Sequence, residues 1–280
     1  MSDKTLSRVE RALDERFDAR LEVDGAQPGL ETIARMLERR SVRRYTDRPV
    51  PHDLLQLLFA AAFSAPSKSD LQQADIVHVA DGAARSAIAD LVPDNPWVRA
   101  APVFLVFCGN SRRTRQISGW RGKPFANDHL DAFMNAAVDA GIVLASFIHA
   151  AEAAGLGCCP ISTIRNRAQQ VSDLLELPDW VFPVAGMCVG YPAEPPRITP
   201  RLPLNTTVHR DRFAEDDIAA QIDGYDRRRA ARLPYAKQRK PEVYGAADFY
   251  GWSEDKARQY SSPERADFGA FIRAKKFNLT

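Results

Sequence analysis

In the first part of this 280-residue chain, hydrophobic residues recur among polar ones at helical spacing, which predicts several helices before the first strand. Residues 6–17 carry apolar side chains at spacings of three and four among charged residues, the pattern of a helix with one buried face. Residues 29–40 repeat that pattern after a break at residues 25–29, and residues 53–63 form a third, strongly apolar helical segment. We therefore expect the chain to begin with a helical extension that precedes the main body of the fold.

Continuous apolar runs predict the strands. Residues 74–80, 102–108 and 181–190 have strand length, and the middle run is apolar throughout, as expected of a strand covered on both faces. Residues 128–154 predict a long central helix whose apolar side chains continue nearly all round, so it must be buried on all sides. In a chain of this size we expect part of that burial to come from a second subunit. The order of elements predicts an α+β fold, with helices packed around a modest central sheet.

The chain changes character after residue 192, where prolines and then basic and aromatic residues follow. This composition predicts an extended excursion rather than a compact second domain. We expect residues 1–28 to form an N-terminal helical extension and residues 29–204 to form the core. Residues 205–280 are expected to form a C-terminal excursion with helices that belong to the same domain.

Composition narrows the class of protein. Hydrophobic residues make up 45% and charged residues 26%, which is ordinary for a soluble protein with a buried core. A formal net charge of +2 gives no reason to expect a polyanion over the whole surface. The start of the chain lacks an apolar signal-peptide region, and polar residues interrupt the long helix, so we expect neither secretion nor a membrane span. The cysteines lie in or beside apolar runs, which is typical of reduced, packed thiols in a cytoplasmic protein: Cys108, Cys158, Cys159 and Cys188.

Two polar clusters carry the candidate chemistry. The first is an arginine-rich run at residues 39–45, and the second is a serine-rich loop at residues 64–72 that ends in Leu71-Gln72. Several guanidinium groups around a hydroxyl can surround a phosphate through forked, charge-assisted hydrogen bonds. Hydroxyl and amide groups nearby offer partners to a polar ring edge. Together the clusters indicate a phosphorylated, ring-bearing cofactor; the alternative for the arginine run is an exposed basic helix end, which the helix dipole favours.

These clusters resemble the opening of the FMN-dependent nitroreductase family, in the branch of major oxygen-insensitive nitroreductases and NADPH-flavin oxidoreductases. Further along, residues 154–157 precede residues 160–166, which resemble that branch's flavin-facing loop, and residues 182–193 resemble its penultimate strand. Residues 200–203 resemble the proline-flanked arginine that follows. The matches occur in order between residues 37 and 204, and together they are more specific than any one of them.

The resemblance implies a nitroreductase-like fold: a central mixed β-sheet, a long central dimer helix and an extended C-terminal excursion, with FMN bound in the core. It implies a cytoplasmic homodimer that oxidises NADPH or NADH and reduces a nitroaromatic, quinone or related electron-poor acceptor by ping-pong kinetics. Flavin N5 carries the hydride, so no catalytic side chain and no metal is expected. By resemblance the FMN ligands are Arg39, Arg40, Ser41, Arg43, Ser67, Ser69, Gln72, Asn95, Pro160, Ile161, Ser162, Thr163 and Arg201.

Several positions depart from the branch's pattern and leave the acceptor open. Asp70 replaces an aromatic residue or asparagine beside the ring, which places a carboxylate near the substrate face. Pro160 replaces an aromatic residue, and Ser162-Thr163 replaces two glycines. Asp70, Pro160 and the long N-terminal arm motivate a second hypothesis within the same fold, namely reductive removal of a leaving group, such as a halide, or reduction of an activated double bond.

A basic run at residues 227–240 allows further interpretations. Relatives bind the extra phosphate of NADPH with C-terminal arginines, so Arg239 is a candidate contact for the nicotinamide cofactor, and Arg265 resembles an arginine near the active site. The alternatives are a solvated helix face, use of NADH, or a nucleic-acid-binding module. The small net charge and the lack of recognition motifs argue against nucleic acid. A non-catalytic flavin-binding protein is the remaining alternative.

Overall fold

The computed structural model describes residues 2–195 and 197–280 and divides them into two compact units. One unit, which we call the helical unit, combines the described part of Met1–Arg40 with Arg197–Glu264. The other, the sheet unit, combines the described part of Ser41–Pro196 with Arg265–Thr280. The division falls inside the arginine-rich run, because the residues on either side of it pack with different parts of the chain.

The sheet unit is built on four strands in the order β1-β2-β4-β3, and every neighbouring pair is antiparallel. An isolated parallel bridge joins Ser41 to Cys158 at the outer edge of β3, so the expected mixed character of the sheet is limited to this bridge. The strand bounds are β1 Ala74–His78, β2 Val103–Asn110, β3 Gly157–Ile161 and β4 Val181–Gly190.

Both faces of the sheet are covered, which confirms the prediction for the continuous apolar run. All eight residues of β2 are buried. Because successive side chains of a strand point to opposite faces, Leu105 and Phe107 join one hydrophobic cluster while Phe104 and Val106 join another.

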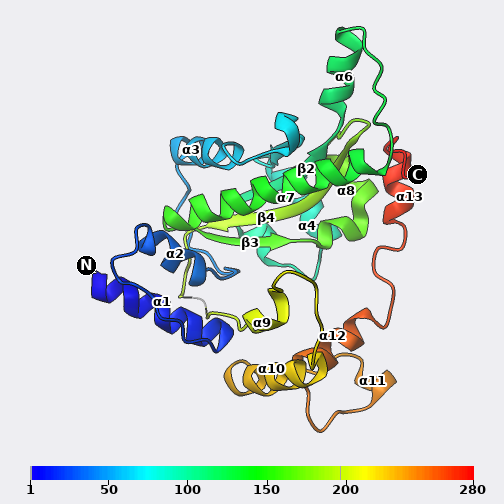
Figure 1. The fold of residues 1–280 in the computed structure, drawn as a ribbon. Helices are drawn as coiled ribbons and strands as arrows, with labels where there is room; N and C mark the ends of the chain where they lie inside the picture. The colour runs from blue at the N-terminus through cyan, green and yellow to red at the C-terminus, as the bar shows by residue number, and fades with distance from the viewer. Residues whose placement is uncertain (1, 196) are drawn as a thin grey trace. The chain divides into compact units, whose positions relative to one another are not determined.

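The first cluster lies under two helices, α3 (His52–Phe63) and α7 (Leu130–Ala153). Figure 1 shows α7 running across the sheet, with α3 beside it. The rings of Phe107 and Phe147 meet edge to face with their centroids 5.8 Å apart. The predicted long helix is therefore confirmed, at nearly its expected bounds.

The second cluster packs under short helices on the opposite face: α4 (Gly82–Leu91), α5 (Trp97–Ala100) and α8 (Ala168–Leu174). The unit also contains η1 (Lys68–Asp70), α6 (Arg112–Trp120), η2 (Thr163–Arg167) and α13 (Phe268–Ala274).

Helix α7 also has an apolar face that the described residues leave exposed. Leu130, Met134 and Val138 are 50%, 56% and 43% exposed, and their spacing of four places them along one side of the helix. Leu57 and Phe63 of the neighbouring α3 are exposed as well. By length and composition α7 could cross a membrane, but side chains such as Phe147 are fully buried in the core of the unit.

The helical unit contains the first two helices of the chain, α1 (Ser2–Phe17) and α2 (Leu30–Leu37), which share a small core. Val9 and Leu13 pack there with Leu30 and Ala34. The predicted domain boundary after residue 28 thus separates two helices that pack together, because amphipathic periodicity gives each helix an apolar face but does not say what covers it. The remaining helices are α9 (Leu204–Thr207), α10 (Ile218–Arg232), α11 (Pro241–Tyr244) and α12 (Trp252–Tyr260).

Candidate active site

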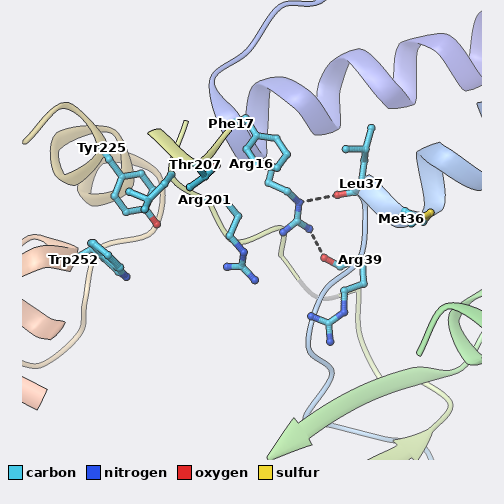
Figure 2. Close-up of a pocket in the computed structure, with 10 residues that line it drawn as sticks. Arg16, Phe17, Met36, Leu37, Arg39, Arg201, Thr207, Tyr225 and Trp252 are labelled. Carbon is cyan, nitrogen blue, oxygen red and sulfur yellow. Dashed lines mark hydrogen bonds between the residues drawn. The ribbon is translucent and has the colours of Figure 1, made fainter. Parts of the chain in front are cut away.

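A pocket of about 630 Å³ in the helical unit contains two of the predicted phosphate ligands, Arg39 and Arg201 (Figure 2). Arg16 contributes a third guanidinium, and we call this the arginine pocket. The other residues that line it are Phe17, Met36, Leu37, Leu202, Thr207, Tyr225 and Trp252. No carboxylate occurs among these described lining residues, so the charge that lines the pocket is positive only.

Local sequence explains how two of these arginines are presented. Arg39 follows directly on the end of α2, where the chain leaves the helix. Arg201 lies in an extended segment flanked by Pro200 and Leu202-Pro203, and the prolines prevent a helix there. The hydroxyl of Tyr225 on α10 donates a hydrogen bond of 3.0 Å to the Pro200 carbonyl, which fixes the segment beside the pocket.

Much of the basic run at residues 227–240 binds other parts of the helical unit. Arg228 and Arg232 of α10 each donate a hydrogen bond of 2.6 Å to a carbonyl at the C-terminal end of α1, those of Phe17 and Asp14. The helix dipole favours a cation at this end, and the Asp14 carbonyl accepts the Arg232 bond in addition to one of 3.0 Å from the backbone N–H of Asp18. Arg239 pairs with the buried Asp255 at 3.0 Å. Its assignment to the nicotinamide cofactor stays a prediction.

In the sheet unit, the residues after the division follow the edge of β3. The backbone N–H of Val42 donates to the Cys158 carbonyl at 3.0 Å. Gly157 allows this close approach, because a Cβ at that position would lie 2.5 Å from a Val42 methyl carbon. Two of the predicted FMN ligands lie in this segment. Ser41 forms the bridge to β3, and the Arg43 guanidinium lies over the Trp97 ring, 5.2 Å from its centroid.

The predicted flavin-facing loop gathers candidate residues from three separate segments. The Thr163 hydroxyl donates to the side-chain oxygen of Asn95. Arg265 donates to Ser162 Oγ at 3.2 Å and to Asn166 Oδ1 at 2.7 Å. The structure therefore brings Asn95 and Arg265 to the adjacent Ser162 and Thr163, although the three segments are far apart in sequence.

Two further features describe this loop. Pro160 lies in β3 at the edge of the four-stranded sheet, where a residue without an N–H is tolerated. Burial lowers the pKa of the Arg165 guanidinium, and the positive charge of Arg265 lowers it further. Arg165 of the loop and Arg265, which contacts the loop, thus bring two positive charges close to one another, an arrangement that favours an anionic partner.

The serine-rich loop adopts an unusual backbone conformation. Ser69, Asp70 and Gln72 all have positive φ angles, of 52°, 57° and 51°. Residues other than glycine rarely adopt this backbone conformation. Ser67 Oγ accepts a hydrogen bond of 3.2 Å from the Gln72 backbone N–H, and the Gln72 amide donates to Asp70 at 3.1 Å. These side chains are thereby brought to one cavity of about 520 Å³ in the sheet unit, which Ser67, Asp70 and Gln72 help to line.

A buried aspartate that the sequence analysis did not assign to the site holds this loop. Asp139 on α7 is 1% exposed, and its two carboxylate oxygens accept backbone hydrogen bonds from Lys68 at 3.0 Å and Gln73 at 3.1 Å. It therefore binds both ends of the strained segment. The signal in the sequence is that Asp139 is one of the polar residues that interrupt the apolar pattern of this helix.

Taken together, the structure defines an α+β protein with strained and basic loops around its sheet and an arginine pocket in its helical unit. The sequence model of the Nitroreductase family matches residues 36–191, and that of the Nitroreductase family C-terminal domain matches residues 199–280. The chain belongs to the nitroreductase family. Its first 35 residues precede both matched segments.

Known proteins of similar sequence and structure agree with this assignment. The chain is 35% identical over 201 residues to the FMN reductase [NAD(P)H] of Bacillus subtilis, covering 70% of this chain and 80% of that protein. It superimposes on B. megaterium NfrA2 with a TM-score of 0.81 and 32% identity, over 89% of this chain and 98% of that one. The NADPH:FMN oxidoreductase from Vibrio harveyi, solved in complex with NAD⁺, gives a TM-score of 0.77 and 30% identity, over 87% and 97%.

The arginine pocket fits the phosphate of FMN by the chemistry of its donors. Arg39 and Arg201 line one hollow, as Figure 2 shows, and neither shares it with a lining carboxylate. Guanidinium groups bind phosphate oxygens through paired hydrogen bonds, which are about twice as strong as neutral ones. Arg40, the next residue in the run, is half-buried and is not among the described residues that line this pocket.

Proposed function

We propose that this protein is an FMN-dependent NAD(P)H oxidoreductase that reduces nitroaromatics, quinones or related electron-poor acceptors. The observation that carries the proposal is the arginine pocket, in which two arginines that the resemblance assigns to FMN, Arg39 and Arg201, line one cavity with no carboxylate among its described lining residues. The relatives named above support the activity, since one is an NAD(P)H-dependent FMN reductase and another was solved with NAD⁺.

Each group of residues has a distinct task in this proposal. Arg39 and Arg201 bind the phosphate and thereby anchor the cofactor. FMN, when bound, supplies the hydride chemistry at its ring. Ser41, Arg43 and the loop around Ser162 orient the ring and provide positive charge near it, and these ring contacts remain predictions. The protein contributes binding, orientation and exclusion of water rather than a nucleophile or a base.

Donor and acceptor are expected to use the same binding face in turn, which gives ping-pong kinetics. NADPH or NADH binds first and leaves as the oxidised nucleotide, and the acceptor then binds in its place. Asp70 lines the cavity of the sheet unit, so the acceptor preference is expected to disfavour anionic compounds near that carboxylate.

We also propose that the protein is a cytoplasmic homodimer. The exposed apolar face of α7 and α3 supports this, because contiguous apolar surface of that kind marks an interaction site. Burial of Cys108, Cys158, Cys159 and Cys188 supports the cytoplasmic location, because buried, packed thiols are typical of proteins in a reducing compartment.

The test is a flavin half-reaction followed by a substrate panel. The purified protein is incubated with FMN, desalted and scanned for flavin absorption near about 450 nm. Anaerobic addition of NADPH or NADH should bleach this band, and the faster nucleotide is the donor. Turnover is then compared for a nitrofuran, a quinone, an activated alkene and a halogenated arene. A protein that binds no flavin would contradict the proposal, and turnover of only the last two compounds would move it to the second hypothesis within the same fold.

A further inference from the structure

Helix α1, which precedes the part of the chain matched by the family, ends at the arginine pocket. Its last turn contains Arg16. This residue is only 7% exposed, although arginine is among the residue types that are least often buried. A buried charge requires hydrogen-bond partners. The partners of Arg16 are therefore informative about what this helix does.

Arg16 contacts both of the segments that carry the phosphate ligands. Its guanidinium donates to the Leu37 carbonyl at 2.9 Å and to the Arg39 carbonyl, as Figure 2 shows, and to the Thr199 carbonyl at 3.4 Å. Its own backbone carbonyl accepts a hydrogen bond of 2.6 Å from the backbone N–H of Arg201. One residue thus fixes the backbone at Arg39 and at Arg201.

The helix that carries Arg16 is itself firmly held within the helical unit. Arg8 forms a forked pair with Glu38, with N–O distances of 3.1 and 2.6 Å, and a second pair with Glu31 at 2.7 Å. Arg228 donates to the Phe17 carbonyl at 2.6 Å and also to the carbonyl of Arg201. The second contact ties α10 to the same phosphate-binding segment.

We propose that Arg16 is a positioning residue for the phosphate site, and that the N-terminal extension is therefore part of the cofactor-binding apparatus. It binds main-chain carbonyls on the two sides of the pocket and so holds the Arg39 and Arg201 side chains ready to bind a phosphate monoester. A pre-organised site binds more tightly, because less conformational freedom is lost when the ligand arrives. The proposal takes the identity of the ligand, FMN, from the proposed function.

The experiment compares FMN with riboflavin, which has the same ring but no phosphate. Dissociation constants of both are measured on the apoprotein by quenching of flavin fluorescence. Arg16→Ala should weaken FMN binding about tenfold or more, the equivalent of about 1.4 kcal/mol, and leave riboflavin binding within about twofold. Arg20→Ala, a control that removes a positive charge from the exposed segment after α1, should change neither constant.

Two further variants separate positioning from charge and from general stability. Arg16→Lys keeps the charge but cannot fork between carbonyls, so it should restore FMN affinity only in part. In a background that lacks both Arg39 and Arg201 side chains, Arg16→Ala should add less than about a twofold loss, because the groups it positions are gone. Equal losses for FMN and riboflavin, full rescue by lysine, or an unchanged effect in that background would each overturn the proposal.

The wild-type protein distinguishes this proposal from the proposed function. If wild type binds neither flavin, the proposed function fails, and inorganic pyrophosphate becomes the probe of the pocket. Its stabilisation of the wild type against thermal unfolding should then be lost in Arg16→Ala and kept in Arg20→Ala. Equal stabilisation of all three proteins would refute the positioning role on its own.

Discussion

Replacing Asp139 by asparagine tests how the serine-rich loop is held. The native carboxylate accepts two backbone hydrogen bonds, from Lys68 and Gln73, at a site that is 1% exposed. Asparagine has nearly the same shape but only one acceptor oxygen, and its amide would face an N–H donor. One bond is therefore lost and a buried donor is left without a partner.

The magnitudes decide whether the loss is local or global. Hydrogen bonds to a charged group contribute about 1.5–3 kcal/mol each, so the two bonds together contribute about 3–6 kcal/mol. The three left-handed residues of the loop cost about 1 kcal/mol each or somewhat more. The strain of this backbone conformation, about 3 kcal/mol in all, therefore opposes the stabilisation by the two hydrogen bonds. Losing one bond brings the two terms close to balance. We expect the loop to open while the rest of the sheet unit, whose core lies elsewhere, stays folded.

Hydrogen exchange measured by mass spectrometry is the assay. Peptides covering residues 67–73 should exchange at least about tenfold faster in Asp139→Asn, the equivalent of about 1.4 kcal/mol, while peptides from β2 and β4 change little. FMN and riboflavin affinities should fall together, because the loop carries predicted ring contacts and not the phosphate site. Asp90→Asn is the matched control, since that carboxylate is 72% exposed. Unchanged exchange at residues 67–73 would refute the reasoning.

The remaining predictions concern the docking of α1 and the dimer. Arg8 lowers the pKa of Glu38 and lowers that of Glu31 to about 2, against a usual value of 4.5. Carboxylates with depressed pKa values stabilise the fold above pH 4.5 and lose that effect as the pH falls through their folded values, so protection of α1 from exchange should decrease between pH 4.5 and about 2. Arg8→Ala should reduce this pH dependence, leaving the smaller part that Arg11 provides through its pair with Glu38 at 3.2 Å, and an undiminished pH dependence would contradict the assignment. If the proposed homodimer forms through this face, Met134→Glu should give a monomer by light scattering, because an unpaired carboxylate would be buried in the interface, whereas Leu174→Glu on α8 should leave the oligomeric state unchanged. A dimeric Met134→Glu protein would exclude this face.

Much of the fold could be predicted because it is encoded locally. The apolar run of β2 and the long apolar pattern of α7 carry their burial in their own sequence. The packing of α1 on α2, and the division of the chain inside the arginine-rich run, depend on contacts between segments distant in sequence. Periodicity predicts that a helix has an apolar face but leaves its partner undetermined.

The sequence predicted those residues of the candidate site whose own side chains line the pocket. It did not predict the residues whose side chains bind backbone groups of other segments. Arg39 and Arg201 belong to recognisable sequence patterns, and the structure brings both to one pocket. Arg16 has no such pattern, because a basic residue in the last turn of a helix is ordinary and is favoured by the dipole. Asp139 was visible as an interruption of an apolar helix, but its role depends on two N–H groups about seventy residues away in sequence.

Arg16 and Asp139 solve the same problem with opposite charges. Asp139 accepts bonds from backbone N–H groups and fixes the serine-rich loop, while Arg16 donates to carbonyls and fixes the arginine-bearing segments. Since neither is assigned a contact with the cofactor, both act by reducing the freedom of groups that are. Their effects should nevertheless differ with the ligand: loss of Arg16 should be detected only by a flavin with a phosphate, whereas loss of the Asp139 carboxylate should be detected by any flavin. A variant series read with FMN alone could not separate the two, and the comparison with riboflavin is therefore the measurement that assigns each buried charge to its part of the site.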